Sequence, residues 1–246
     1  MFKVIVIASG KGGTGKTSLS AGVATALADL GRRVLVIDGD SGLRNLDIVL
    51  GMSDSVVFSF ADVARGVVAL EKAAAPHPAI ERLSMLTAPV GAPALSENGM
   101  RLLAAQAQEM GFEYVVIDGP AGLAPELRAF AQIATQGIVI STPDSASIRG
   151  AERVARLLEE EHIMRVRLVI NRIRPRLIQY GLASNVDDAM DLTGLQLLGI
   201  VPEDEDVIAC GNSGKSILRI KKTGASLAYR NIARRLEGER LPVMKV

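Results

Sequence analysis

The sequence predicts one α/β domain: a mainly parallel, twisted sheet with helices on both faces. Three observations predict it. Short, almost continuously apolar runs recur along residues 1–246, helical segments alternate with these runs, and a glycine-rich loop follows the first of them. Strands that are apolar on both faces are typical of a parallel sheet whose two sides are covered by helices. We find no internal repeat and no linker, so we expect a single domain.

Seven apolar runs are the predicted strands. Each is rich in Val, Ile or Leu and is closed by turn-forming residues, which is the pattern of a buried strand. They lie at residues 4–7, 34–37, 83–86, 115–117, 138–140, 168–170 and 197–201. Amphipathic or Ala-rich segments predict helices between and after them. These lie at residues 16–30, 101–110, 148–161 and 225–236. Because strand and helix alternate, we expect right-handed crossovers.

The composition excludes several classes of protein. No apolar run approaches the ~18 residues that a membrane span needs. The 28 basic and 27 acidic residues give a net charge of +1, without the basic surplus of a general nucleic-acid binder. Aromatic residues make up 3 %, so platforms for stacking single-stranded bases are scarce. Cys210 is the only cysteine, which excludes an internal disulfide; we expect a small buried side chain there.

A complete phosphate-binding motif, G-x-x-x-x-G-K-[ST], follows the first strand and precedes a helix. Its residues are Gly10, Lys11, Gly12, Gly13, Thr14, Gly15, Lys16 and Thr17. The glycines let backbone N–H groups converge on phosphate oxygens at the positive end of the helix. We expect Lys16 to bridge the β- and γ-phosphates of ATP and Thr17 to bind Mg²⁺. Ser18, the next residue, is also expected to contact the nucleotide.

The same glycines permit a second interpretation. Gly10, Gly12 and Gly15 also satisfy G-x-G-x-x-G, the motif of dinucleotide-binding folds, and Asp38 or Asp40 stands near the distance expected for a ribose-binding acid. That motif alone is weak evidence, because a dinucleotide site does not need the Lys-Thr pair that follows the last glycine. An ATP site needs both residues. The ATP interpretation is therefore preferred.

Two of the predicted strands end in aspartates. Asp38 and Asp40 follow the second strand, and Asp118 follows the strand at residues 115–117. Ligands bind at the carboxyl ends of parallel strands, where these side chains would meet the phosphate loop. Each aspartate alone could equally serve in a turn or as a helix cap. With a complete loop beside them, we expect Asp38 and Asp118 to hold Mg²⁺ and Asp40 to orient the attacking water.

Several segments resemble the deviant Walker A, or MinD/ParA, family of P-loop ATPases. The early second lysine of the loop, Lys11, is typical of that family. The other similar segments are residues 38–51, 118–122, 169–172 and 200–204. The resemblance spans residues 2 to about 220. It is most specific at the sequence LRNLD, which is typical of the MinD branch, and it implies the fold of a P-loop NTPase.

The resemblance implies an ATP-timed switch. ATP-bound copies would pair face to face, and Lys11 of each copy would reach the phosphates of the other, adding positive charge in the transition state. Asp40 would position the lytic water, while Asn171 and Pro202 would border the adenine. The implied catalytic residues are thus Lys11, Lys16 and Asp40. The implied cofactors are ATP or ADP with Mg²⁺, and the implied activity is a slow ATP hydrolysis that separates the homodimer.

The resemblance also implies partners and a location. Members of the MinD branch gather at the inner membrane and recruit the division inhibitor MinC, and they are discharged by MinE or governed by other polar factors. They attach through a short C-terminal amphipathic helix. Here the stripe of Leu227, Ala228, Ile232 and Leu236 is expected to pack on the core, and few residues follow it, so we expect the membrane-targeting helix to be absent. No signal peptide precedes the first strand, which predicts a cytoplasmic protein, with peripheral membrane binding left open.

Two other functions share these motifs. A ParA-type partition ATPase would bind DNA, which the balanced charge disfavours, and a regulator of flagellar number commonly has extra N-terminal residues. An iron–sulfur reductase or carrier needs paired cysteines, which this sequence lacks. DNA is therefore not an expected ligand, and division-site selection is the preferred function. The arginines scattered over residues 165–176 are expected on a solvated face.

Overall fold

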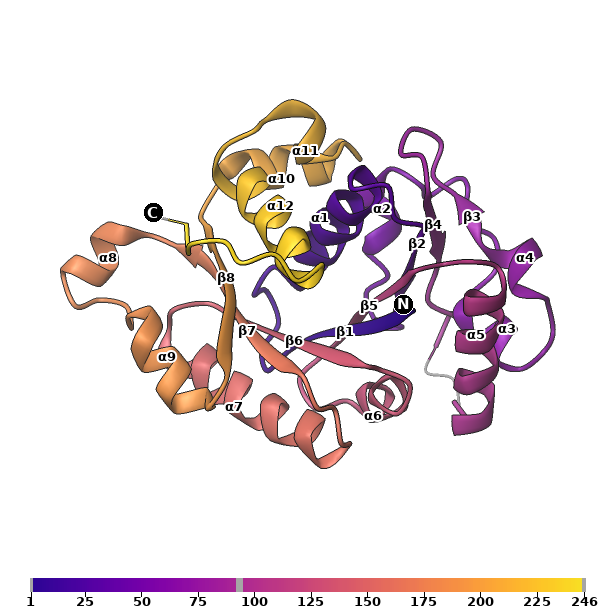
Figure 1. Ribbon diagram of the computed structural model, residues 1–246, viewed down its shortest axis with the longest axis horizontal. Helices are drawn as coiled ribbons and strands as arrows, with labels where there is room; N and C mark the ends of the chain where they lie inside the picture. Colours follow the sequence, from indigo (N-terminus) through magenta and orange to yellow (C-terminus); the bar gives the residue numbers. More distant parts are fainter. Residues whose placement is uncertain (1, 92–94, 245–246) are drawn as a thin grey trace.

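The computed structural model describes residues 2–91 and 95–244. At its centre lies an eight-stranded sheet in the order β3-β4-β2-β5-β1-β6-β7-β8 (Figure 1). All neighbouring strands are parallel except β3, which runs antiparallel to β4. The strands are β1 (Lys3–Ser9), β2 (Val34–Asp38), β3 (Ala75–Pro76), β4 (Leu83–Leu86), β5 (Tyr114–Ala121), β6 (Gln136–Ser141), β7 (Val166–Ile173) and β8 (Gln196–Pro202).

All seven predicted strands are confirmed, and each lies within one of the observed strands. β2 and β6 are buried at every position, as expected of strands covered by helices on both sides. The sequence did not predict β3, because this strand has only two residues and one of them is a proline. Proline lacks a backbone N–H group and is tolerated at the edge of a sheet, which is where β3 lies.

Helices cover both faces of the sheet. One face carries α1 (Lys16–Asp29), α2 (Leu46–Leu50), α10 (Glu205–Asn212), α11 (Ile217–Ile220) and α12 (Gly224–Leu236). The other face carries α3 (Phe60–Ala64), α4 (Leu70–Ala73), α5 (Glu97–Glu109), α6 (Pro125–Ala131), α7 (Ser145–Glu160) and α9 (Val186–Thr193). The short helix α8 (Pro175–Gln179) projects beyond β8 at the left of Figure 1. The predicted α/β architecture is confirmed.

Two helices begin earlier than their apolar periodicity predicts. α5 begins at Glu97 because the hydroxyl of Ser96 caps it, and α7 begins at Ser145 because the carboxylate of Asp144 caps it. Such a side chain accepts a hydrogen bond from one of the first free N–H groups, which starts a helix before its buried face begins. Sequence periodicity alone therefore places these two helix starts too late.

α12 packs against the sheet and α1 with one face. Ala228, Ile232 and Leu236 are buried, as predicted, and Cys210 on α10 is buried too. The prediction was wrong for Leu227, which is 36 % exposed. The buried stripe repeats every four residues, and residue 227 is rotated away from it by about 100° because an α-helix has 3.6 residues per turn.

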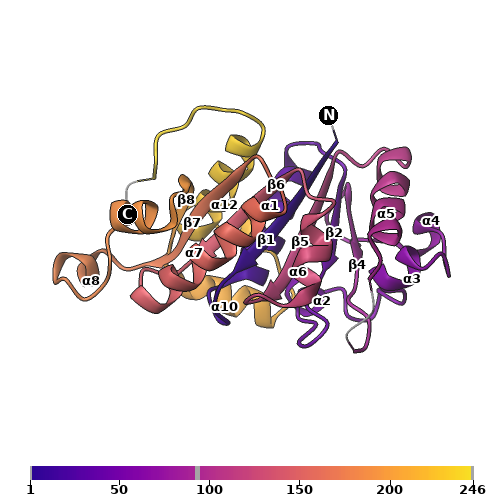
Figure 2. The same cartoon turned by 90° about the horizontal axis from the view of Figure 1, so that it is seen from below.

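Figure 2 shows the two edges of the sheet. The N-terminus and the segment that follows α12 lie at the upper edge, and α2 and α10 lie at the lower edge. Parallel strands all end on the same side of a sheet. The loops after β1, β2, β5 and β7 therefore meet at one edge, which we call the carboxyl edge, and the opposite edge is the amino edge. None of the helices within residues 2–91 and 95–244 has the length and hydropathy needed to cross a membrane.

Candidate nucleotide site

The phosphate loop joins β1 to α1 with a backbone that needs glycine. Gly13 and Gly15 have φ angles of 78° and 89°, in the left-handed region, and Gly15 is the N-cap of α1. At Gly10 the reason is space, since a Cβ atom there would lie 2.0 Å from the carbonyl carbon of Gly150 on α7. The loop therefore presents the positive end of α1 to a bound phosphate and is fixed from behind by α7.

Lys16 lies buried on the first turn of α1. Its Nζ is 3.1 Å from Asp118 Oδ1, and the hydroxyl of Ser20 donates to the same oxygen at 2.8 Å. The structure thus brings together the predicted phosphate-binding lysine and a predicted Mg²⁺ ligand. The sequence analysis missed Ser20, although it lies one helical turn after Lys16, where an i, i+4 spacing could have indicated it.

Asp38 and Asp118 are register partners at the ends of β2 and β5, and both are buried. Burial, followed by the charge of Asp118, raises the pKa of Asp38 to about 6. A divalent cation beside these carboxylates would relieve their repulsion. Mg²⁺ is commonly held by one or two carboxylates together with phosphate oxygens and water, and Thr17, whose side chain carries a hydroxyl group, lines the adjoining cavity. The donor set of Thr17, Asp38 and Asp118 therefore fits this ion.

Asp40 lies on the wall of the same cavity, which the phosphate loop also lines. Its carboxylate accepts the backbone N–H groups of Gly42 and Leu43 at 3.1 and 3.2 Å. This turn shapes the segment that leads to Asn45, the N-cap of α2 and another residue of the cavity wall. The residue predicted to position water is therefore at the site, with its carboxylate engaged by its own loop.

Lys11 lies at the outer rim of the loop, where its Nζ is 3.5 Å from Asp144 Oδ1. Asp144 also caps α7 and accepts a hydrogen bond from Thr142. Burial alone would raise the pKa of Asp144, but the hydrogen bonds from Thr142 and Ser147 and the charge of Lys11 outweigh it and lower this pKa. The ion pair is half exposed, and such pairs contribute about 0–1 kcal/mol. Lys11 can therefore exchange Asp144 for another anion at small cost.

Two cavities meet at the loop. The first, of about 280 Å³, is lined by the phosphate loop and Asp40, and the second, of about 400 Å³, is lined by Asn171 and Pro202. Ser18 and Arg172 line both. Cavities of a few hundred Å³ are the size of small-molecule sites. A nucleotide would place its phosphates in the first cavity and its base in the second, beside the two residues predicted to border the adenine.

Two residues of the second cavity have contacts that the sequence did not predict. The side-chain amide of Asn171 donates to the Thr14 carbonyl at 2.7 Å, so Asn171 also braces the phosphate loop. Arg172 has a φ of 57°, a left-handed conformation that is uncommon outside glycine and turns its side chain between the two cavities. Tyr229 of α12 lines the second cavity as well, and nothing in the sequence pattern pointed to it.

Comparisons with known proteins agree with this geometry. The family described as the CobQ/CobB/MinD/ParA nucleotide binding domain matches residues 5–217. The chain is 39 % identical to the septum site-determining protein MinD of Bacillus subtilis over 251 residues, which cover 99 % of this chain and 92 % of that protein. The corresponding protein of Synechocystis is 37 % identical over 247 residues, with the same coverage. The chain belongs to the MinD family of septum site-determining ATPases.

A solved structure supports the same assignment for this MinD-family chain. The MinC:MinD cell division protein complex of Aquifex aeolicus matches it with a TM-score of 0.92 and 34 % identity, over 99 % of this chain and 98 % of that chain. The P-loop NTPase fold and the ATPase activity predicted from the sequence are confirmed. The chain is thus a MinD-family ATPase, and the dinucleotide interpretation is abandoned.

Proposed function

We propose that this MinD-family ATPase is a switch in division-site selection: Mg-ATP lets two copies pair, and hydrolysis separates them. The observation that carries the proposal is the contrast between the two lysines of the loop. Lys16 is buried against Asp118, whereas Lys11 is 54 % exposed at the rim of the phosphate cavity. A buried lysine serves the phosphates of its own copy, and an exposed one can serve the phosphates of a second copy.

Within one copy, each predicted site residue has a position that suits its role. Lys16 contacts the β- and γ-phosphates of ATP, while Asn171 and Pro202 border the base. Thr17, Asp38 and Asp118 would hold Mg²⁺, which would neutralise part of the phosphate charge. The γ-phosphate of ATP would replace the carboxylate of Asp118 as the partner of Lys16, and Asp118 would then be available to Mg²⁺.

Hydrolysis needs a positioned water and additional positive charge at the γ-phosphate. Asp40 lies on the cavity wall two residues beyond Asp38 and orients the water. Lys11 of the partner subunit supplies the charge, as an arginine finger does in related phosphoryl transfers. When the γ-phosphate leaves, the anion that held this lysine leaves too. Lys11 then returns to Asp144 of its own chain, and the two copies separate.

The partners follow from the family. The Aquifex aeolicus structure that resembles this chain is a MinC:MinD complex, so we propose a MinC-type division inhibitor as a partner of the ATP-bound dimer. A MinE-type regulator would stimulate hydrolysis. The protein works in the cytoplasm and at the cytoplasmic face of the inner membrane as a peripheral protein. ParA-type partition and flagellar regulation are not favoured by any contact described above.

Sizing the protein by gel filtration with light scattering, in ADP and in ATP, tests the switch. We expect a monomer with Mg-ADP and a dimer with Mg-ATP. The Lys11→Ala variant should bind ATP within about threefold of wild type, since its side chain is exposed, yet stay monomeric and lose at least ~100-fold in turnover. Lys72→Ala, which removes an exposed lysine on α4, is the matched control and should behave like wild type.

Several outcomes would contradict the proposal. A Lys11→Ala variant with wild-type turnover would show that the exposed lysine does not act on a second copy. A protein that stays monomeric with ATP while hydrolysing it would exclude the dimer altogether. ATP-dependent, salt-sensitive binding of duplex DNA would instead support a partition ATPase, because counterion release makes such binding weaken steeply with salt.

A further inference from the structure

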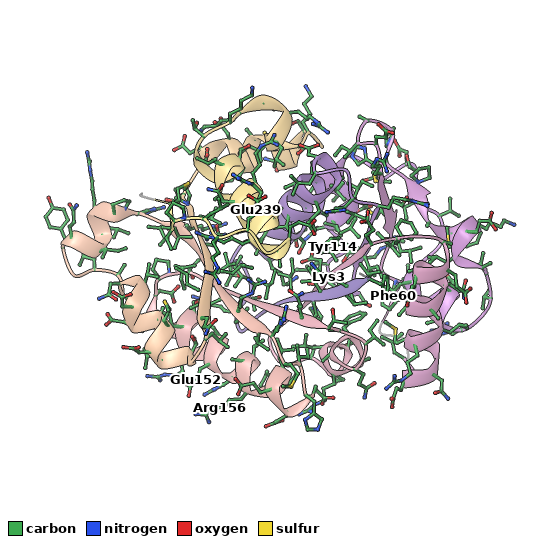
Figure 3. The ribbon with its side chains drawn as sticks, in the orientation of Figure 1. Lys3, Phe60, Tyr114, Glu152, Arg156 and Glu239 are labelled. Atoms are coloured by element: carbon green, nitrogen blue, oxygen red, sulfur yellow. The ribbon has the colours of Figure 1, made fainter. Side chains whose placement is uncertain are left out.

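A large polar cavity lies at the amino edge of the sheet, on the side opposite the phosphate loop. Its volume is about 750 Å³, and it lies between the starts of β6, β7 and β8 and the segment that follows α12. Figure 2 shows this segment at the upper edge of the sheet, and Figure 3 labels one of its residues, Glu239. The charged residues of the lining are Arg165, Arg167, Arg235, Glu239 and Arg240. Positive charge therefore dominates the cavity.

Two arginines of this cavity, Arg167 and Arg235, donate hydrogen bonds to neutral acceptors. Arg167 donates to the side-chain oxygen of Gln136 at 3.3 Å. Among the residues that the structure describes, Arg235 donates to three backbone carbonyls, those of Leu198, Leu241 and Pro242, at 2.5 to 3.0 Å. No ion pair among residues 2–91 and 95–244 involves Arg165, Arg167 or Arg235.

The one carboxylate of the lining does not compensate these charges. Glu239 lies 2.7 Å from Arg234, which is not part of the lining. Burial, followed by the neighbouring charges of Arg165 and Arg235, lowers the pKa of Arg167, and burial lowers the pKa of Arg235. Both effects mean that the charged form of each arginine is less well stabilised here than it is in water. An anion in the cavity would remove that penalty.

We propose that this cavity is a second ligand site, which binds a phosphate-bearing anion. Planar guanidinium groups bind phosphate oxygens through two parallel hydrogen bonds, and four arginines line this cavity. The volume lies within the range of small-molecule sites, so a diphosphate or a phosphorylated headgroup fits. The site lies at the other edge of the sheet from Lys16, so both ligands can be bound at once.

Calorimetric titration with inorganic pyrophosphate tests the site directly. The protein is first saturated with Mg-ADP in excess Mg²⁺, so that the phosphate loop is already occupied. We expect one further binding event per chain. Arg167→Gln and Arg165→Gln should each weaken it at least tenfold. Arg153→Gln, which removes an exposed arginine of α7 outside the cavity lining, should leave it unchanged.

Arg165 is exposed, so the Arg165→Gln variant keeps the test valid even if Arg167→Gln does not fold. No further binding event, or equal affinity in all three variants, would overturn the proposal. ATP turnover should be unchanged in Arg165→Gln, which separates a failure of this site from a failure of the switch proposed above.

Two sources of the phosphate group can be distinguished by sedimentation with vesicles. Vesicles of phosphatidylglycerol and of phosphatidylcholine are compared, each with wild type and Arg165→Gln. If the ligand is a lipid headgroup, wild type sediments only with phosphatidylglycerol, pyrophosphate releases it, and Arg165→Gln sediments less. If the ligand is a soluble phosphate compound, Arg165→Gln weakens pyrophosphate binding but leaves sedimentation unchanged.

Discussion

The two edges of the sheet differ in the partners that their positively charged side chains contact. At the carboxyl edge, Lys16 faces Asp118 and Lys11 faces Asp144, so each lysine already has a carboxylate partner. At the amino edge, Arg167 and Arg235 face an amide and backbone carbonyls. A phosphate that enters the first site must displace a carboxylate, whereas one that enters the second adds a negative charge to arginines that have only neutral acceptors among the described residues. The first arrangement favours reversible exchange of a bound phosphate group, and the second favours keeping a phosphate group bound.

Some charged side chains at the amino edge do have partners of opposite charge. Beside the arginine cavity, Glu237 accepts a hydrogen bond from Tyr114 and one from Arg32 Nε at 2.7 Å, and Lys3 donates to the Tyr114 hydroxyl at 2.7 Å. Figure 3 labels Lys3 and Tyr114 at the start of their strands. Burial and the hydrogen bond to Glu237 raise the pKa of Tyr114, so it stays a neutral donor. A cluster in which the carboxylate of Glu237 balances positive charge thus lies beside the arginine cavity, in which positive charge dominates.

The largest effect should come from Lys16→Ala at the carboxyl edge. We expect ATP affinity, measured by calorimetry, to fall at least ~100-fold, which corresponds to about 2.7 kcal/mol. The variant also leaves Asp118 buried without its cation, and breaking a buried pair costs roughly 3 kcal/mol of folding stability. Lys11→Ala, in the same loop, is the control that should change neither quantity much. Comparable losses in both variants would show that burial does not separate the two lysines.

A smaller effect is expected from Glu237→Gln at the amino edge. It weakens two charge-assisted hydrogen bonds, so we expect a loss of about 1–2 kcal/mol in the free energy of unfolding at pH 7. Burial alone would raise the pKa of Glu237, but Tyr114 and Arg32 outweigh it and lower that pKa. A lowered carboxyl pKa stabilises the fold above the unfolded value of about 4.3, and this is lost as pH falls through the folded value.

Denaturant titrations of wild type and Glu237→Gln at several pH values measure this difference. The difference in unfolding free energy should reach its maximum at pH 6 to 7 and shrink below about pH 4. At low pH the wild-type carboxyl group is protonated and is then as neutral as the glutamine side chain. Glu239→Gln is the matched control, because within residues 2–91 and 95–244 the ion-pair partner of Glu239 is the partly exposed Arg234. A difference that grows on acidification would contradict the assignment of this cluster as compensated.

The smallest effect should come from a pair at neither edge. Glu152 and Arg156 lie 2.6 Å apart on the outer face of α7, as labelled in Figure 3, and Arg156 is largely exposed. Such i, i+4 pairs contribute about 0.3–0.5 kcal/mol, and salt screens them. Arg156→Gln should therefore lower stability by no more than this, and the loss should vanish in 1 M salt. A larger loss would mean that the contribution of a charged side chain to the free energy of unfolding does not depend on whether it lies at an edge of the sheet.

Much of the fold could be predicted because burial on both faces leaves a plain sequence pattern. The central strands are apolar at nearly every position, and the phosphate loop is a contiguous motif, so both are visible in a single sequence. Helix starts were less accessible, since the caps at Ser96 and Asp144 precede the apolar pattern. The two-residue strand β3 is too short to leave any pattern.

The parts of the site that escaped prediction are contacts between distant segments. Asp144 and Gly150 of α7 reach the phosphate loop across more than 130 residues of sequence, and neither belongs to a motif. The arginine cavity is a similar case. The sequence predicted a solvated face for the arginines at residues 165–176, and that was wrong for Arg167, which is partly buried beside Arg235 of α12. The spacing of residues along the sequence does not indicate such contacts between distant segments.

The contact between Gly10 and Gly150 has a mechanical consequence. With no side chain between them, the backbone of the loop rests on the backbone of α7, and a Cβ atom on Gly150 would come within 3.0 Å of Gly10. There is no soft layer to absorb displacement. A displacement of the loop toward α7 would therefore press directly on the backbone of this helix.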